Sequence, residues 1–147
     1  MKKLVLLAVI LAGCVTTTVT EVVTHSQVFT ADDKEADALY AAAMIGMWRI
    51  YRSPGATVQY ADPDIGLIIS EGATSVGLNP NSLGISAGII VYFRLILEVQ
   101  QGRVRATVED VHTASRYGLY GDALVAFRAQ IQGMMATLAA AIHEPAW

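Results

Sequence analysis

Apolar and polar residues alternate with a period of two on both sides of Gly102, a pattern typical of a β-hairpin over residues 89–112. If Gln101-Gly102 forms the tip, one face of the hairpin carries only apolar pairs. These pairs are Val99 with Val104, Leu97 with Ala106, and Leu95 with Val108. A slip of one residue would turn this apolar set toward solvent, so the hydrophobic pattern fixes the register.

The opposite face of the hairpin gives an independent indication of the same register. It pairs Glu98 with Arg105 and Arg94 with Glu109, two opposite-charge pairs that a shifted register would lose. The next inner pair would set Phe93 against Asp110. We therefore expect the pairing to bend or stop at that point.

A helix is predicted from about Ala31 to Arg52. Thr30 is the expected cap, and the acidic residues in 32–37 would lie near the positive end of the helix dipole. The alternative interpretation, that these acidic residues bind calcium, lacks the spacing of an EF-hand loop. The apolar stripe expected to face the core is Ala36, Tyr40, Ala43, Met47 and Ile50.

A second helix is predicted from Asp122 to about His143. Its apolar residues recur at three and four positions, and they are Leu124, Phe127, Ile131, Met134, Leu138 and Ile142. Because Arg128, Gln130 and Gln132 lie in one half, the pattern favours a core helix over a membrane span.

Shorter strands are expected at residues 21–29, 57–61 and 65–71, the last two joined by a turn at residues 62–64. Residues 72–88, rich in glycine, are expected to form one long loop and are a first place to look for a partner contact.

The elements therefore follow the order strand, helix, four strands, helix. The fold class expected is α+β: a single antiparallel sheet of about five strands with both helices on one face, similar to helix-grip folds. At 147 residues with 54% hydrophobic and 16% charged residues, the chain can form one domain, placed at residues 21–144, without disulfide or metal.

The N-terminus resembles the leader of bacterial lipoproteins. Lys2 and Lys3 precede an apolar run over residues 4–11, which is too short to cross a bilayer. The run ends in Leu11-Ala12-Gly13-Cys14, which resembles a lipobox, and Cys14 is the only cysteine of the chain. An ordinary signal peptide or a buried strand is the alternative.

The lipobox resemblance implies cleavage between Gly13 and Cys14, removal of residues 1–13, and diacylglycerol with a further acyl chain such as palmitate on Cys14. Residues 14–20 would then be the lipidated N-terminus and a short tether. No cofactor is expected besides this covalent lipid.

Charge supports attachment through the lipid. Loss of Lys2 and Lys3 leaves 13 acidic side chains and lowers the net charge from −3 to −5. An acidic body repels anionic lipid and nucleic-acid phosphate, so we expect no nucleic-acid partner. In the lipoprotein family, an aspartate after the cysteine favours the inner membrane. Val15 therefore favours the outer membrane, facing the periplasm, within the bacterial cell envelope.

The mature chain also resembles a family of envelope-associated bacterial domains of unknown function that have a TBP-like fold. The residues that carry this resemblance are Trp48, Tyr60, Gly66, Gly102-Arg103 and Arg105, and it covers residues 23–143. It implies a fold and no activity. The chain departs from the family in lacking a lysine-rich surface and in its long loop over residues 72–88.

The sequence carries no enzyme signature. His25, His112 and His143 are far apart and form no HxxxH or HxH pair, so no metal site is expected. Residues 84–88 only superficially resemble a nucleophile elbow, and no phosphate-binding loop is present. We expect a protein that is not an enzyme, and a hydrolase is the least favoured of three hypotheses.

Two surfaces remain as candidate sites. Tyr92, Arg94, Arg103 and Arg105 would lie on the outer face of the sheet, where they could bind a carboxylate, a glycan or a protein; the alternative is a solvated face crossed by ion pairs. Trp48, Tyr51 and Tyr60 could line a groove between helix and sheet, although an aromatic core is the default.

The function favoured is a membrane-anchored, non-catalytic binding or assembly module with an unidentified partner, such as another envelope protein. The alternative is a carrier of a small apolar ligand. It requires a cavity between helices and sheet, since ligand pockets measure roughly 300–1,000 Å³.

Overall fold

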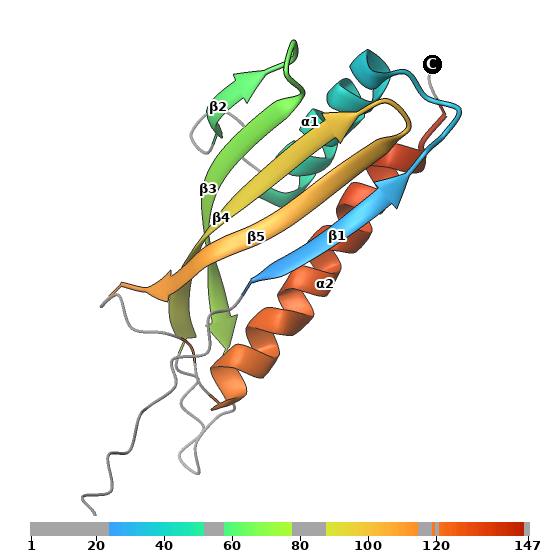
Figure 1. The fold of residues 1–147 in the computed structure, drawn as a ribbon. Helices are drawn as coiled ribbons and strands as arrows, with labels where there is room; N and C mark the ends of the chain where they lie inside the picture. The colour runs from blue at the N-terminus through green and yellow to red at the C-terminus, as the bar shows by residue number, and fades with distance from the viewer. Residues whose placement is uncertain (1–23, 52–57, 78–87, 115–118, 120, 146–147) are drawn as a thin grey trace, which may run out of the picture.

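Five antiparallel strands lie side by side in the order β1-β5-β4-β3-β2, and two helices cover one face of the sheet (Figure 1). The computed structural model describes residues 24–51, 58–77, 88–114, 119 and 121–145. The elements are β1 (His25–Thr30), α1 (Ala36–Tyr51), β2 (Val58–Asp62), β3 (Leu67–Gly77), β4 (Gly88–Gln100), β5 (Arg103–Thr113) and α2 (Gly121–His143). The predicted α+β class, strand number and placement of the helices are confirmed.

The hairpin formed by β4 and β5 has the predicted register. Val99 pairs with Val104 and Leu95 with Val108, and these side chains are buried beneath the helices. On the other face, Glu98 pairs with Arg105. Gly102 has a φ of 71° at the tip, a left-handed conformation that glycine adopts without strain.

The register shifts between Tyr92 and Arg94, where the pairing was expected to bend. Asp110 takes up the extra residue with a φ of 51°. A bulge of this kind keeps Phe93 in the core while Asp110 turns out to solvent. The conflict between an apolar and an acidic residue is therefore resolved by the backbone.

The predicted start of the first helix is wrong. Thr30 is the last residue of β1 and pairs with Arg103, so it caps no helix. The segment that follows is held as a turn on the hairpin tip, because the amide of Ala31 donates to the carbonyl oxygen of Gly102 at 2.8 Å. The helix begins at Ala36, and only Asp37 of the acidic group lies in its first turn.

The buried stripe of α1 differs in part from the expected one. Ala43 and Met47 are fully buried, whereas Tyr40 and Ile50 are only partly so. Leu39 and Gly46 are buried as well. A Cβ atom added to Gly46 would lie 3.0 Å from a methyl carbon of Leu138, so glycine allows α1 and α2 to approach closely.

The predicted loop over residues 72–88 is also wrong in its first part. The strand β3 continues to Gly77, and residues 72–77 pair with the start of β4 from Phe93 back to Gly88. Val76 points into the core and is fully buried, which anchors this glycine-rich extension. Residues 78–87 lie outside the described residues, as do residues 21–23 of the predicted first strand.

The helix α2 forms the larger part of the helical layer. All six residues of its predicted apolar stripe are buried against the sheet or α1. By length and composition alone α2 could also cross a bilayer. Its stripe is instead occupied by contacts with the rest of the domain, as predicted for a core helix.

The two helices differ in length, and this difference leaves part of the sheet uncovered. At 1.5 Å per residue, the 16 residues of α1 measure about 24 Å and the 23 residues of α2 about 35 Å. The 13 residues of β4 extend about 44 Å. α1 starts beside the hairpin tip, so its last residue, Tyr51, lies well short of the other end of the sheet (Figure 1).

Candidate functional site

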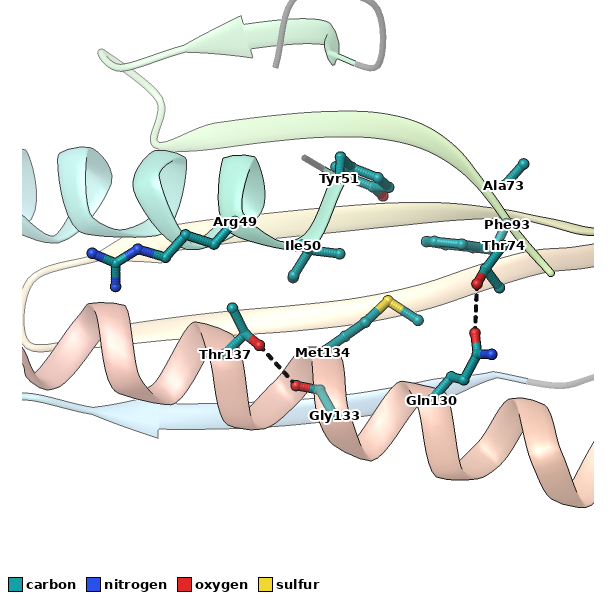
Figure 2. A pocket seen from close by; sticks show the side chains of 10 residues that line it. All are labelled: Arg49, Ile50, Tyr51, Ala73, Thr74, Phe93, Gln130, Gly133, Met134 and Thr137. Atoms are coloured by element: carbon teal, nitrogen blue, oxygen red, sulfur yellow. Dashed lines mark hydrogen bonds between the residues drawn. The ribbon is translucent and has the colours of Figure 1, made fainter. Parts of the chain in front are cut away.

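A cleft of about 450 Å³ opens where α1 ends (Figure 2). Its floor is formed by β3 and β4, with Thr74 and Phe93 exposed to the space, and its walls are the last turn of α1 and the middle of α2. The volume falls within the range of small-molecule pockets, roughly 300–1,000 Å³. The cleft is partly open to solvent, so a ligand could enter without unfolding the domain.

Tyr51 closes the cleft on the α1 side. Its ring stacks on Phe93 at a centroid distance of 5.9 Å, and its hydroxyl group lies 3.1 Å from Oγ of Ser70. Burial raises the pKa of Tyr51 to about 12, although the hydrogen bond with Ser70 lowers it in part. A Cβ atom on Gly72 would lie 2.2 Å from the ring, so the glycine in β3 makes room for Tyr51.

The opposite end of the cleft is closed by a polar bridge between β3 and α2. The Thr74 hydroxyl donates to Oε1 of Gln130 at 2.5 Å (Figure 2). Nε2 of Gln130 donates to the carbonyl oxygen of Ser75 at 3.0 Å. Gln130 thus satisfies both ends of its amide within the protein. The bridge holds α2 at a fixed distance from the uncovered part of the sheet.

Arg49 stands at the far end of the cleft from this bridge (Figure 2). Its guanidinium group donates two hydrogen bonds to the Glu144 carboxylate, at 2.6 and 3.0 Å. The hydrogen bonds raise the pKa of Arg49 and lower that of Glu144. Both side chains remain nearly half exposed, at 45% and 44%, so water screens this ion pair.

Among the described residues, the lining of the cleft includes no aspartate, glutamate or histidine. Arg49 is its one charged side chain there, and the remaining polar groups are neutral amides and hydroxyls. Ile50 and Met134 form the apolar wall between the two polar ends (Figure 2). The cleft can therefore hold an apolar molecule, and it has no described group that would act as an acid or base near neutral pH.

The structure separates the predicted outer-face residues into two groups. Tyr92 and Arg94 lie together near the bulge, whereas Arg103 and Arg105 lie near the hairpin tip, about 14 Å away along β5. Arg105 pairs with Glu98 at 3.5 Å. Arg103 donates from Nε to the side-chain oxygen of Gln100 at 2.9 Å. The four residues share a face without forming one site.

A second hollow of about 330 Å³ lies beside the bulge. Arg94 crosses it, 3.1 Å from Glu71, 3.7 Å from Glu109 and 3.8 Å from Asp110. Tyr92 stacks on His112 at 5.6 Å along the same hollow. Arg94 thus already contacts three carboxylates, which leaves little of its charge for a ligand.

The aromatic residues predicted for a groove divide in the same way. Tyr51 lines the cleft, whereas Trp48 and Tyr60 are exposed by 44% and 45% and lie outside it. The expectation that Trp48 and Tyr60 belong to an aromatic core is therefore wrong.

Within the part of the chain that the structure describes, no three histidine, cysteine or acidic side chains are close enough to share a metal ion. Gly13 and Cys14 lie outside this part.

The sequence pattern did not indicate Arg49, Thr74, Gln130 or Gly133 as site residues. The pattern predicts a loop at Thr74, so the predicted sheet lacks the strand that forms the floor of the cleft. The signals that were available are Gln130 and Gly133, a polar residue and a glycine that stand directly beside the apolar stripe of the last helix.

Comparisons with known proteins identify a family whose function is unknown. The model of a domain of unknown function with a TBP-like fold, DUF4468, matches residues 25–114 of the chain. A comparison with curated proteins finds no match.

Two solved structures are similar in fold. A DUF4468 family protein from Bacteroides ovatus has a TM-score of 0.66 and 14% identity, over 84% of this chain and 88% of that one. A TBP-like protein from Parabacteroides distasonis has a TM-score of 0.63 and 12% identity, over 85% and 95%. At such identities the similarity concerns the fold alone.

Proposed function

The chain belongs to the DUF4468 family, and from that premise we propose that it is a lipid-anchored envelope protein whose domain is a non-catalytic binding module. Its binding site is the cleft between α1, α2 and the sheet. The observation that carries this proposal is the cleft of about 450 Å³ over the part of the sheet that α1 leaves uncovered.

The anchor is the diacylglyceryl group on Cys14, with palmitate or a similar chain on the new N-terminus. The lipobox over residues 11–14 and the acidic mature chain support it. Ten residues separate Cys14 from β1, a span of at most about 40 Å. The domain therefore stays close to the membrane, and Val15 favours the outer membrane, on its periplasmic side.

The absence of catalysis is supported by the chemistry of the described lining. Tyr51 is the one residue there whose titration the protein shifts strongly, and its pKa of about 12 keeps it protonated at neutral pH. A general base or acid needs a pKa near the working pH. In this proposal the site binds a small molecule without metal or cofactor; the acidic net charge of the mature chain supports the further proposal that the domain has no nucleic-acid partner.

The cleft also favours the carrier hypothesis over assembly with an envelope protein. A volume of about 450 Å³ bounded on several sides suits a small molecule, whereas protein interfaces are larger and flatter.

The anchor is tested by Cys14→Ser. The natural chain should carry the mass of the lipid and remain with membranes, and the variant should lose both. An unmodified thiol with Met1 still attached in the natural chain would overturn the anchor.

The cleft is tested by filling it. A Cβ atom added to Gly133 meets no other atom within 4 Å, so Gly133→Leu has room for its side chain at the edge of the cleft. We expect it to weaken binding of a neutral fluorescent probe, N-phenyl-1-naphthylamine. Ala136→Leu adds the same side chain to an exposed position of α2 outside the lining and should bind the probe as the natural chain does. If Gly133→Leu binds the probe as tightly as Ala136→Leu and the natural chain do, the cleft is not the binding site.

A further inference from the structure

We infer that the ligand of the cleft is an amphipathic organic anion, whose apolar body lies between Ile50 and Met134 and whose acidic group pairs with Arg49. This inference rests on the proposed function and names the ligand class. It follows from three observations: the charge of the lining, the position of Arg49, and the pairing of Arg49 with the exposed carboxylate of Glu144, which a ligand could replace.

The charge of the cleft is opposite to that of the chain as a whole. The mature chain has 13 acidic and 8 basic side chains, a net charge of −5. The described lining nevertheless carries one arginine and no carboxylate. A ligand with a negative group therefore meets no carboxylate of the lining itself, and it gains the attraction of Arg49 once it has displaced the Glu144 carboxylate.

Arg49 is placed for such a pairing. It lies in the last turn of α1, at the end of the cleft opposite the Thr74–Gln130 bridge (Figure 2). Guanidinium groups bind carboxylates, sulfonates and phosphates through two parallel hydrogen bonds, and Glu144 already uses this geometry.

Glu144 acts as a stand-in for the acidic group of the ligand. It lies just beyond the end of α2, and its carboxylate is 44% exposed, so it can turn to water when a ligand displaces it. Its backbone stays in place, because Lys34 donates from Nζ to the carbonyl oxygens of Ile142 and Glu144 at 2.6 and 2.5 Å. Exchange of one carboxylate for another therefore requires no change in the fold.

The rest of the cleft suits an apolar body. Met134 can adapt its flexible side chain to a ligand, and Phe93 presents part of its ring from the floor. Thr74 and Gln130 at the closed end satisfy each other, so an apolar end of the ligand reaching them leaves no buried polar group without a partner.

The experiment compares two fluorescent probes that share the same aromatic rings. The probe 8-anilino-1-naphthalenesulfonate carries an anionic group, and N-phenyl-1-naphthylamine does not. Binding is measured with the full lipidated chain in nanodiscs, with empty discs subtracted. The natural chain should bind the sulfonate up to about fivefold more tightly than the neutral probe, since an exposed, water-screened ion pair contributes no more than this.

Substitutions at the Arg49–Glu144 ion pair then separate the contribution of the charge to binding from the contribution of the apolar lining. Arg49→Gln should remove the preference for the sulfonate over the neutral probe, and Arg49→Lys should restore part of that preference. Glu144→Gln should tighten sulfonate binding severalfold, because the competing carboxylate is gone. Glu98→Gln is the matched control, since Glu98 is also 44% exposed and paired with an arginine; it should change neither affinity.

The outcomes distinguish the two levels of the proposal. If both probes bind equally and Arg49→Gln has no effect, the anion is wrong and the cleft remains. If Gly133→Leu leaves both affinities unchanged, the cleft itself is wrong. Equal tightening by Glu98→Gln and Glu144→Gln would mean that only net charge matters and would also overturn the role of Arg49.

Discussion

The two faces of the sheet hold their charged groups in opposite ways. On the outer face, Arg94 and Arg105 contact carboxylates of neighbouring strands, so the charges serve the pairing of β3, β4 and β5. On the inner face, the described cleft has one cation, Arg49, whose partner comes from the exposed end of α2. An arginine whose charge is balanced by carboxylates of neighbouring strands has little charge left to attract a ligand. Arg49 differs, because its carboxylate partner is exposed and can be replaced by the acidic group of a ligand.

The largest expected difference between the faces concerns stability. Leu97 is fully buried on the inner face, so Leu97→Ala should lower the free energy of unfolding by about 2–5 kcal/mol. Its neighbour Ile96 points to the outer face and is only partly buried, so Ile96→Ala should cost clearly less. Urea denaturation of both variants measures this. Equal losses would mean that the outer face is covered in the protein as it exists.

A smaller effect is expected from the titration of Tyr51. Its pKa is about 12 in the folded protein and 10 is the ordinary value, so the unfolded chain loses this proton first as the pH rises. The contribution to stability is complete below pH 10 and is lost as the pH rises through the folded pKa.

The absorbance of the phenolate, compared between the natural chain and Tyr51→Phe, follows this single residue. The difference spectrum should show a transition near pH 12. A transition near pH 10 would contradict the packing of Tyr51 between Ser70 and Phe93.

Two glycines should respond in opposite directions to alanine. Gly133 lies within α2 and has open space around it, so Gly133→Ala should stabilise the protein by about 0.5–1 kcal/mol. Gly66 has a φ of 69°, and an added Cβ atom would lie 2.1 Å from the carbonyl oxygen of Val99, so Gly66→Ala should destabilise it. Thermal unfolding compares the two, and a gain in stability from Gly66→Ala would contradict the turn at Gly66, whose carbonyl oxygen accepts a hydrogen bond from the amide of Val99 at 2.7 Å.

The smallest effect belongs to the Glu98–Arg105 pair. A double-mutant cycle to alanine should give a coupling of about 0.2–1 kcal/mol that decreases in high salt, because the pair is exposed and screened. A coupling that high salt leaves unchanged would indicate a desolvated pair and a covered outer face.

The hairpin and α2 could be predicted from the sequence because the pattern of apolar residues that determines each of them lies within the element itself. A period of two around Gly102 and a three-and-four spacing in α2 each allow one arrangement of apolar residues. The start of α1 could not be predicted in this way. The amide of Ala31 is held by the carbonyl oxygen of Gly102, a partner far away in sequence, and the strand pairing of Thr30 prevails over its capping preference.

The cleft escaped prediction for a related reason. Its floor is the extension of β3 beyond residue 71. The glycines in this segment predict a loop, whereas the segment forms a strand because it pairs with β4. Arg49 and Glu144 meet because the end of α2 lies beside α1, a contact between two helices that no spacing within either helix reveals.

Methyl NMR of the lipidated chain in nanodiscs, titrated with 8-anilino-1-naphthalenesulfonate, compares the two faces in one measurement. The account predicts that the methyl signals of Ile50 and Met134 in the cleft shift in a saturable way, while those of Val28 and Ile96 on the outer face do not move. Saturable shifts at Val28 and Ile96 with none at Ile50 and Met134 would contradict it.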